Sequence, residues 1–361
     1  MAIFTDVFDD VTKLGRKIPT SDYQENGEHP IIDQGQNEIA GYTDETDGLF
    51  TDVPAIIFGD HTRVVKYVDT PCFLGADGVK LLKAKDHQAN HKYLYHVLAN
   101  AKIPNTGYNR HFKWLKEVNI PLPNEAEQQR IVEVLDRLNG LIALRKEQLA
   151  KLDELVKARF VEMFGTEDEF SKWFCCTIGD VAEVCVGVVI KPTQYYAENG
   201  IPAFRSLNIG PMRVKDSDWV YFTEEGHRKN QKSVIRKNDV LVVRSGAPGT
   251  ACVVTDEYDG YNAVDIIIAH PKPNKVDSVF LAAFTNMPHG MNQIRERTGG
   301  AAQQHFNVGG YKAMNLILPP MELQKQFAAF VEQTNKTKLT IQASLDKLEV
   351  MKKALMQEYF G

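Results

Sequence analysis

Four short polar loops carry most of the side chains of this sequence that could contact a nucleic acid. Two are turns between apolar segments, at residues 59–63 (Gly-Asp-His-Thr-Arg) and 244–250 (Arg-Ser-Gly-Ala-Pro-Gly-Thr). The other two are residues 106–112 (Thr-Gly-Tyr-Asn-Arg-His-Phe) and 298–306 (Thr-Gly-Gly-Ala-Ala-Gln-Gln-His-Phe). Arg, Asn, Gln and His side chains can hydrogen-bond to base edges, and loops carry function when a scaffold positions them. Taken singly, each loop is a weak signal, because short polar loops occur in any protein.

No motif for catalysis accompanies these loops. The sequence contains no G-x-x-x-x-G-K-S/T phosphate loop, no Gly-rich cofactor loop of methyltransferase type and no Asn/Asp-Pro-Pro-Tyr/Phe motif. His87, His91 and His96 are four and five residues apart, a spacing that suits zinc poorly. The five cysteines form no C-x-x-C pair, so we expect free thiols. The residues therefore favour a non-catalytic chain without a metal site.

Composition limits both the cellular location and the mode of binding. The 361 residues are 43% hydrophobic and 25% charged, which is ordinary for a globular protein. No apolar stretch approaches the ~20 residues of a membrane span, and the first residues lack a signal-peptide layout. We therefore expect a cytoplasmic protein. The net charge of −5 limits DNA binding by the isolated chain, since affinity for DNA rests on neutralising phosphates.

The elements that must position the loops include an internal repeat. Residues 118–165 align with residues 314–361 at a constant offset of 196 positions without a gap. Both copies begin with a proline-containing entry (IPLP and LILPP) and end in Phe-Gly. Proline suits an extended entry to a helix, and Gly165 and Gly361 lie where a left-handed cap would end one. Each copy is predicted to form one long helix.

Apolar residues in both predicted helices alternate spacings of four and three, which is typical of a coiled-coil seam. The polar residues at seam positions differ between the copies, which favours pairing of one helix with the other. A long helix docked only on its own domain would show the same periodicity, and the duplication argues against that alternative. The apolar seam positions are Ile131, Leu135, Leu138, Ile142, Leu149, Leu152 and Val156, and Phe327, Val331, Ile341, Leu345, Leu348 and Leu355.

A globular segment of mixed α and β character precedes each predicted helix, and the two segments differ in sequence. We expect strands at 55–58 and 64–68 in the first and at 239–243 and 251–255 in the second. Helices are expected near 93–101 and 280–286. The chain thus divides into a first domain (1–117), a first helix (118–165), a second domain (166–313) and a second helix (314–361). This arrangement imitates a two-fold dimer, and dimeric DNA readers contact two half-sites at a fixed separation.

The duplicated entry IPLPNEAEQQRIV, repeated as LILPPMELQKQF, resembles the conserved regions of specificity subunits from type I restriction-modification systems. In the first domain, IIDQGQNEIAGYTD, IIFGDHTRVVKYVDTPCFLGADGVKLL and GYNRHFKWLKE resemble one class of target-recognition domain. In the second, GIPAFRSLNIG, KSVIRKNDVLVVRSGAPGTACVV and GGAAQQHFNVGGYKAMNLILP resemble another. The resemblance covers nearly the whole chain.

This resemblance implies an α+β fold, with two mixed α/β recognition domains joined by two long helices in an antiparallel coiled coil. Each domain would read one half of a split, asymmetric site in double-stranded DNA, and the helices would set the gap. The partners would be two adenine-N6 methyltransferase subunits and ATP-dependent restriction (translocase) subunits. S-adenosylmethionine, ATP and Mg would belong to those partners, and this chain would bind no cofactor.

We hypothesise that loop residues from both domains approach the DNA. Glycines beside them, including Gly59, Gly107 and Gly246, would permit close approach of the backbone. For each arginine, an ordinary structural or surface salt bridge is an equally good explanation. The residues are His61, Thr62, Arg63, Lys66, Tyr108, Asn109, Arg110 and His111 in the first domain, and Arg205, Ser206, Arg244, Ser245, Gln303, Gln304 and His305 in the second.

Two other functions fit the same observations. The chain could be the specificity partner of a different methylase or nuclease architecture, such as one fused enzyme. It could also be a coiled-coil scaffold whose domains bind proteins, an interpretation that the acidic net charge favours slightly.

Overall fold

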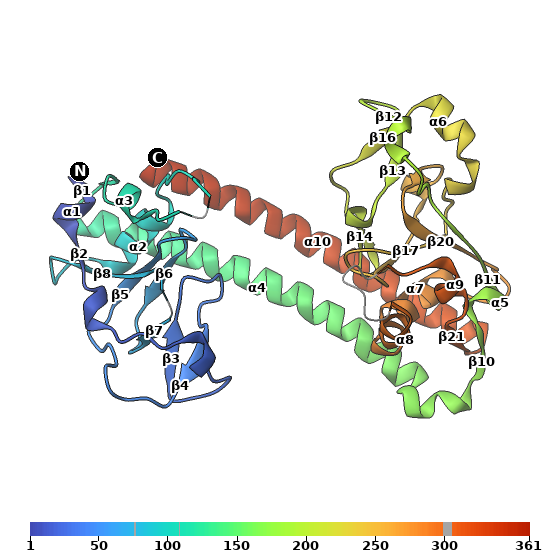
Figure 1. Cartoon of the computed structure of the whole chain (residues 1–361), viewed down its shortest axis with the longest axis horizontal. Helices are drawn as coiled ribbons and strands as arrows, with labels where there is room; N and C mark the ends of the chain where they lie inside the picture. Colours follow the sequence, from blue (N-terminus) through green and yellow to red (C-terminus); the bar gives the residue numbers. More distant parts are fainter. Residues whose placement is uncertain (76, 108, 299–304) are drawn as a thin grey trace. The chain divides into compact units, whose positions relative to one another are not determined.

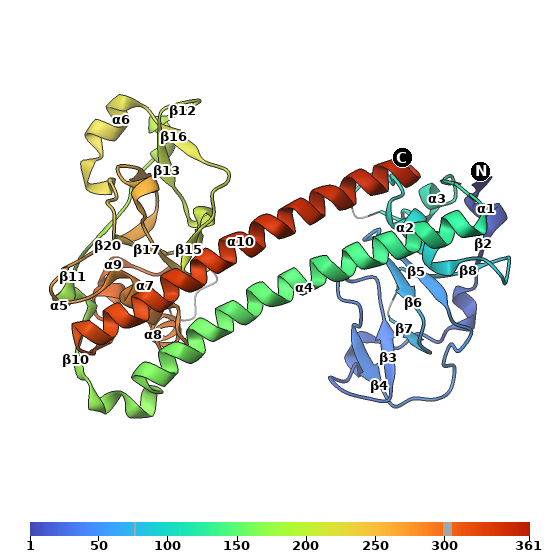
Figure 2. The same cartoon turned by 180° about the vertical axis from the view of Figure 1, so that it is seen from behind.

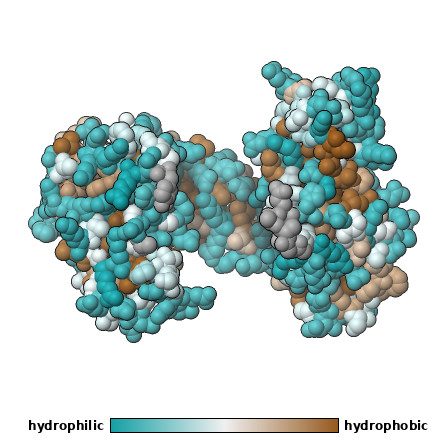
Figure 3. Space-filling view, viewed as in Figure 1, coloured by the Kyte–Doolittle hydropathy of each residue, from teal (hydrophilic) through white to brown (hydrophobic). Residues whose placement is uncertain are grey.

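The computed structural model describes residues 1–75, 77–107, 109–298 and 305–361. The chain folds into two compact units. Unit 1 comprises Met1–Lys146 and Ala343–Gly361, and unit 2 comprises Glu147–Gln342. In the described part of the chain, no helix has the length and apolarity that crossing a membrane would require. Polar residues dominate the visible surface of both units (Figure 3).

Unit 1 contains two main sheets. An antiparallel sheet has the order β2-β8-β5-β6, and a second sheet has the order β4-β3-β7, in which β3 pairs with β4 antiparallel and with β7 parallel. Strands β1 and β9 form a separate antiparallel pair. The strands are β1 (Ala2–Ile3), β2 (Phe8–Asp10), β3 (His29–Ile32), β4 (Gly41–Thr43), β5 (Ala55–Gly59), β6 (Val65–Val68), β7 (Phe73–Leu74), β8 (Val79–Ala84) and β9 (Asn119–Ile120).

Unit 2 repeats this topology. Its antiparallel sheet has the order β11-β20-β17-β18, and in its second sheet β13 pairs with β16 antiparallel and with β19 parallel. Strands β10 and β21 form the matching separate pair. The strands are β10 (Phe174–Thr177), β11 (Ala182–Val186), β12 (Tyr196–Ala197), β13 (Ile201–Phe204), β14 (Ile209–Gly210), β15 (Arg213–Val214), β16 (Val220–Phe222), β17 (Val240–Val243), β18 (Ala251–Val253), β19 (Asn262–Ala263), β20 (Ile266–Pro271) and β21 (Asn315–Leu318).

The short helices occupy matching places in the two units. Helices α2 and α7 each have nine residues, and each is capped by a side chain that accepts from the first turn, Asn90 from Tyr93 N (3.0 Å) and Asp277 from Val279 N (2.8 Å). The helices are α1 (Phe4–Val7), α2 (His91–Ala99) and α3 (Phe112–Leu115) in unit 1, and α5 (Ile178–Val181), α6 (Glu224–Lys229), α7 (Ser278–Asn286), α8 (Pro288–Thr298) and α9 (Val308–Lys312) in unit 2.

The internal repeat therefore extends beyond the long helices, where sequence similarity reveals it, into the domain that precedes each of them. The central strands β5 and β17 read Ala-Ile-Ile-Phe-Gly and Val-Leu-Val-Val, and every residue in them is buried. Continuous apolar runs of this length suit strands that are covered on both faces. The two domains thus share a backbone plan while their loops differ.

The two long helices are α4 (Glu125–Phe164) and α10 (Met321–Phe360), and each contributes one half to each unit. They lie side by side within each unit (Figures 1 and 2). In unit 1, Lys146 pairs with Glu349 (3.0 Å). In unit 2, the rings of Phe160 and Phe327 are 5.5 Å apart. Residue numbers rise along one helix as they fall along the other, so the pairing is antiparallel, as the expected fold class required.

The proposed seam residues are all buried or half-buried. The polar seam residue Lys338 is accommodated because its Nζ lies 2.5 Å from Asp153 Oδ1 of the facing helix. Gly165 ends α4 with a φ of +87°, the left-handed conformation that glycine adopts most readily. The helices begin later than predicted, because residues 119–120 and 315–318 form strands β9 and β21 instead.

Candidate nucleic-acid interface

In unit 1, the turn between β5 and β6 is closed by backbone hydrogen bonds. Gly59 N donates to Val64 O (2.8 Å) and Arg63 N donates to Gly59 O (2.7 Å). Arg63 has a φ of +62°, an uncommon conformation for a residue with a side chain. Its guanidinium donates to Ile103 O (3.3 Å). The turn thus holds Arg63 against the segment that leads into the 106–112 loop, and Thr62 beside it is exposed.

Gln34 connects its own loop after β3 to the β5–β6 turn and to the loop before β8. The sequence analysis did not name it as a candidate. Its Oε1 accepts from His61 N (3.1 Å), its Nε2 donates to Asp77 O (3.0 Å), and its carbonyl accepts from Thr62 Oγ1 (2.7 Å). The signal was present in the sequence, because residues 33–37 read Asp-Gln-Gly-Gln-Asn directly after an apolar segment. This loop belongs with the two that the sequence indicated.

His111 lies inside the fold and not at its surface. It is 0% exposed, and its N and Nδ1 bond to Asp60 O at 2.8 and 3.0 Å. The Asp60 carboxylate in turn accepts from Phe112 N (2.7 Å). The His111 side chain anchors its loop to the β5–β6 turn, and this position does not support a direct contact with DNA. Asn109 and Arg110 of the same loop are exposed.

Lys66 is likewise structural. Its side chain is 7% exposed, and its Nζ donates to Asn37 O (2.5 Å) and lies 3.5 Å from Asp33 Oδ1. Burial lowers the pKa of this ammonium, and the Asp33 carboxylate opposes that shift. Contact with a phosphate would require Lys66 to leave both partners. The prediction that it approaches DNA is not supported by its position.

Arg110 belongs to a charged group at the exposed rim of unit 1. Lys17 pairs with the Asp77 carboxylate (2.9 Å) and, with a smaller contribution from Arg110, lowers the pKa of that carboxyl. Asp77 is 96% exposed, so water weakens these attractions. The two cations remain available to a more strongly charged ligand, such as a phosphate backbone.

In unit 2, Arg244, Ser245 and His305 come together. The Arg244 guanidinium bonds to Asp265 Oδ1 (2.6 Å), to His305 Nε2 (2.5 Å) and to Phe306 O (3.1 Å). Because Nε2 accepts from arginine, His305 carries its proton on Nδ1, which lies 2.7 Å from Ser245 Oγ. Arg244 is 8% exposed, whereas His305 is exposed. The cluster therefore presents the imidazole and hydroxyl outward and holds them with a buried guanidinium.

Asp265 completes this cluster, and the sequence analysis missed it. It has a φ of +50° and follows the two-residue strand β19, so no local motif marks it. Arg205 and Ser206 lie on another loop, directly after β13. There the Arg205 guanidinium donates to Asp218 O, and Arg205 N donates to Asn208 Oδ1 (2.9 Å).

One backbone hydrogen bond shows that the two sites are equivalent. Phe306 N donates to Arg244 O (2.9 Å) in unit 2, as His111 N donates to Asp60 O (2.8 Å) in unit 1. In both units the bond ties the loop before the long helix to the residue after the central strand. Arg205 follows β13 as Asp33 follows β3. The loops that follow the equivalent strands β5 and β17 therefore carry predicted residues in both units, and Arg205 follows β13 of the second sheet.

Tyr108, Gln303 and Gln304 lie outside the described residues, and their role stays a prediction. Among the residues that the structure describes, no group of three or more His, Cys, Asp or Glu side chains could hold a metal ion. His96, one of the three histidines considered above, bonds to Asp136 (3.0 Å).

Comparison with known proteins identifies the family. Residues 5–154 and 171–350 match the model described as type I restriction modification DNA specificity domain. Among curated proteins, the chain is 28% identical over 252 residues to the specificity subunit of the type I restriction enzyme EcoR124I/EcoR124II of Escherichia coli, covering 63% of this chain and 60% of that protein. It is 23% identical over 264 residues to the MjaIX specificity subunit of Methanocaldococcus jannaschii, covering 67% and 60%. The alignments thus span about 60% of the length of these relatives.

Solved structures share the fold. The type I restriction-modification S subunit from M. genitalium superposes with a TM-score of 0.62 at 18% identity, over 99% of this chain and 95% of that one. A chain from a study of complex assembly and conformational transition in the type I R-M system superposes with a TM-score of 0.53 at 17% identity, with the same coverage. The chain belongs to the family of type I restriction-modification DNA specificity domains.

Proposed function

We propose that this chain is the DNA-reading specificity subunit of a type I restriction-modification complex. Residues 1–117 and 166–313 read different halves of a split, asymmetric site in double-stranded DNA. Residues 118–165 and 314–361 form the spacer that fixes the gap between the halves. Methylation of adenine N6 and cleavage are carried out by partner subunits, and this chain has no catalytic role.

The observation that carries this proposal is the pair of equivalent loop edges with unlike side chains. In each unit, a loop before a long helix is bonded to the residue after a buried central strand. At that place unit 1 has Asp60, and unit 2 has Arg244. Side chains that bond to base edges supply sequence specificity, so unlike loops on one scaffold support the reading of two unlike half-sites.

The charge of the chain supports a role within a complex. A net charge of −5 leaves little of the phosphate neutralisation on which DNA affinity depends. Two methyltransferase (modification) subunits and the restriction subunits would supply it, together with S-adenosylmethionine, ATP and Mg. A cytoplasmic location follows from the same proposal, because the substrate is the cell's DNA.

Within the interface, we assign direct contacts to the accessible residues and a supporting role to Arg244. The supporting role follows from its burial and from its bonds to Asp265 and His305. The glycines at 59, 107 and 246 permit the backbone to approach the duplex. The contact residues are His61, Thr62, Arg63, Asn109 and Arg110 in unit 1 and Arg205, Ser206, Ser245 and His305 in unit 2. Tyr108, Gln303 and Gln304, which lie outside the described residues, stay predicted contacts on sequence grounds alone.

The test is to co-express the chain with a cognate methyltransferase subunit and to map N6-methyladenine across the host DNA by single-molecule sequencing. We expect a bipartite motif with methylated adenines in both halves. Arg244→Ala should relax or abolish reading of one half-site, and Arg110→Ala should affect the other. Arg137→Ala, an exposed change on α4, is the matched control and should leave the motif unchanged.

Other outcomes would contradict the proposal. Methylation at no defined motif despite a stable complex would favour a coiled-coil scaffold that binds proteins. A single undivided motif would favour the specificity partner of another methylase or nuclease architecture. An unchanged motif with Arg244→Ala would remove this residue from the interface.

A further inference from the structure

Unit 2 contains a cleft of about 480 Å³ that is separate from the candidate nucleic-acid interface. Asp239, which bonds to His270 in the wall of this cleft, directly precedes β17, whereas Arg244 of the interface directly follows that strand. A cleft of this size suits a small molecule. Its lining residues with polar or reactive side chains are Glu183, Cys185, Gln231, Lys232, Arg236 and His270.

Three side chains at this cleft are linked by hydrogen bonds. His270 Nδ1 lies 2.7 Å from Asp239 Oδ1, and His270 Nε2 lies 3.7 Å from Cys185 Sγ. The other carboxylate oxygen of Asp239 accepts from Arg236 N (2.6 Å), so the carboxylate is fixed from two sides. A nucleophile beside an imidazole that a third group orients is an arrangement by which proteins activate cysteine.

The imidazole of this cluster is cationic at neutral pH. Asp239, whose side chain is 5% exposed, raises the pKa of His270 to about 10, and Cys185 contributes to the shift. Both ring nitrogens then carry a proton, so Nε2 donates toward the sulfur. A cation beside a cysteine favours the thiolate, which is the nucleophilic form. The thiol form has a partner too, since Sγ lies 3.5 Å from Lys232 O, and ionisation exchanges this carbonyl for the imidazolium.

The charges around the thiol favour an anionic ligand. The side chains of Lys232 and Arg236 are exposed at the cleft. With His270 they place three cations among the lining residues, where Glu183 supplies the opposing carboxylate. Clefts lined mainly by one sign of charge attract ligands of the other sign. His270 is 31% exposed and Cys185 is half-buried, so a small molecule in the cleft can reach both.

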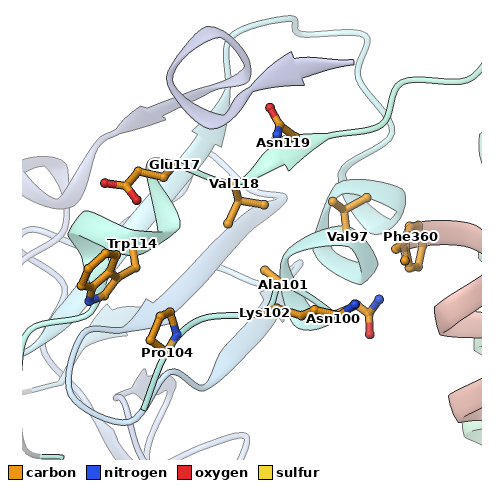
Figure 4. A pocket seen from close by; sticks show the side chains of 11 residues that line it. Val97, Asn100, Ala101, Lys102, Pro104, Trp114, Glu117, Val118, Asn119 and Phe360 are labelled. Atoms are coloured by element: carbon orange, nitrogen blue, oxygen red, sulfur yellow. The ribbon is translucent and has the colours of Figure 1, made fainter. Parts of the chain in front are cut away.

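Unit 1 has the same strands without this cluster. The pairing of β2 with β8 matches that of β11 with β20, which places Val11 at the position of Cys185. Lys83 likewise takes the place of His270. The pocket that Phe360 lines in unit 1 (Figure 4) is no substitute, since the described residues around it include no cysteine or histidine. The common fold therefore does not require a thiol beside an imidazole.

We propose that Cys185, His270 and Asp239 form a reactive-thiol site at which a small carboxylate-bearing disulfide modifies this chain. The Cys185 thiolate attacks one sulfur of the disulfide, and a new S–S bond forms. The old S–S bond breaks, and its electron pair leaves on the second sulfur, which takes up a proton from water. Cys185 is thereby oxidised, and one half of the disulfide is reduced to a thiol. His270 keeps its proton, and Lys232 and Arg236 attract the carboxylates.

The experiment treats the full chain with dithiodiglycolate, a small disulfide that carries two carboxylates, and follows each cysteine by mass spectrometry. Cleavage before Asp180 places Cys185 and the exposed Cys175 on separate peptides. At about pH 6 an ordinary thiol is almost fully protonated. His270→Gln should therefore slow the reaction of Cys185 at least about fivefold at this pH and leave that of Cys175 unchanged. The difference should shrink toward about pH 9, where ordinary thiols ionise without help.

A matched neutral reagent tests the part that the cations play. The diamide of dithiodiglycolate has nearly the same size and no charge. The ratio of the two rates, dicarboxylate over diamide, should be at least about threefold higher at Cys185 than at Cys175. Lys232→Gln should lower this ratio at Cys185. Lys215→Gln, the same change at an exposed residue outside the cleft lining, should leave the ratio unchanged.

The proposal is overturned if Cys185 reacts equally fast in the wild type and in His270→Gln at the lower pH. Equal rate ratios at the two cysteines would overturn the carboxylate-bearing ligand. Unfolding of a variant cannot imitate the expected result, because it would speed the reaction of Cys185 and expose the buried Cys72 and Cys252 to the reagent. None of these readouts uses DNA or methylation, so the result is independent of the proposed DNA-reading function.

Discussion

The two units use one backbone plan with different side chains at its loop edge. In unit 1, the carboxylate of Asp60 is turned inward and holds Phe112 N. In unit 2, the side chain at the same place is Arg244, which reaches across to Asp265 and His305. The backbone bond from the next loop is retained in both. The scaffold therefore depends on backbone pairing, which leaves the side chains at this edge free to differ.

A second matched position lies on an interior strand of each main sheet. Lys83 on β8 pairs with Asp52 (2.9 Å), and His270 on β20 pairs with Asp239 (2.7 Å). Each cation is the fifth residue of its strand. The ion pair is kept while the cation changes from Lys to His and its Asp partner comes from a different place, three residues before β5 in unit 1 and one residue before β17 in unit 2. These pairs therefore stabilise their own unit and do not specify the common fold.

The largest expected effect comes from the helix ends. Phe164 is 0% exposed among Phe160, Trp173, Phe280 and Phe327, so Phe164→Ala should lower the free energy of unfolding by about 3–5 kcal/mol. Phe360 is half-buried beside the pocket, and Phe360→Ala should cost about 1–2 kcal/mol, since less apolar area is lost.

Urea unfolding of the two variants checks this comparison. Trp114 reports on unit 1, and Trp173 and Trp219 report on unit 2. Leu339→Ala, at a position 71% exposed, is the control and should change stability little. Equal losses for Phe164→Ala and Phe360→Ala would mean that the 166–173 segment does not stabilise its helix end.

The long helices could be predicted from sequence because their signals are local. Periodicity, Pro entries and Phe-Gly exits place them within a few residues of α4 and α10. Their first residues were assigned wrongly because β9 pairs with β1, more than a hundred positions earlier, and no local pattern reveals such a partner. The order of strands within the sheets was unpredictable for the same reason.

The residue types at the interface could be predicted from the sequence, but the exposure of each side chain could not. Arg244, Ser245 and His305 were named from two separate loops, and the structure brings them together. His111 and Lys66 were named by the same reasoning and are buried. A polar residue type alone does not show whether the side chain has a partner within the domain, as His111 has in Asp60 and Lys66 has in Asp33. Gln34 and Asp265 were missed because their partners lie on other loops.

A change of intermediate size is expected in how the stability contributed by the His270–Asp239 pair depends on pH, compared with that of the Lys83–Asp52 pair. Asp239, which is 5% exposed, raises the pKa of His270 to about 10, with Cys185 contributing. Because the pKa is raised on folding, the contribution to stability is complete below the ordinary histidine pKa of about 6.5 and is lost as the pH rises toward about 10. At about pH 6, His270→Gln should lower the free energy of unfolding by about 1.5 kcal/mol. This value is the lower end for hydrogen bonds to charged groups, because the ring is partly exposed.

The measurement is the stability difference between wild type and His270→Gln in urea across this pH range. The difference should shrink steadily with rising pH. Lys83→Gln at the matched position is the control, and the loss of the stability difference with rising pH should be specific to His270→Gln. A constant difference for His270→Gln would show that the ring is neutral in the folded protein.

The smallest effect distinguishes two ion pairs between the long helices. Lys338 is 16% exposed and pairs with Asp153, whereas Lys146 and Glu349 are 59% and 45% exposed. Double-mutant cycles with Lys→Met and acid→Ala should give a coupling near ~1 kcal/mol for the first pair and about 0.2 kcal/mol for the second. Salt at about 1 M should remove the second coupling and reduce the first less, because partly buried pairs are screened less. A larger coupling for Lys146 would mean that Lys338 lies at the seam for packing of its methylene stem and not for its charge.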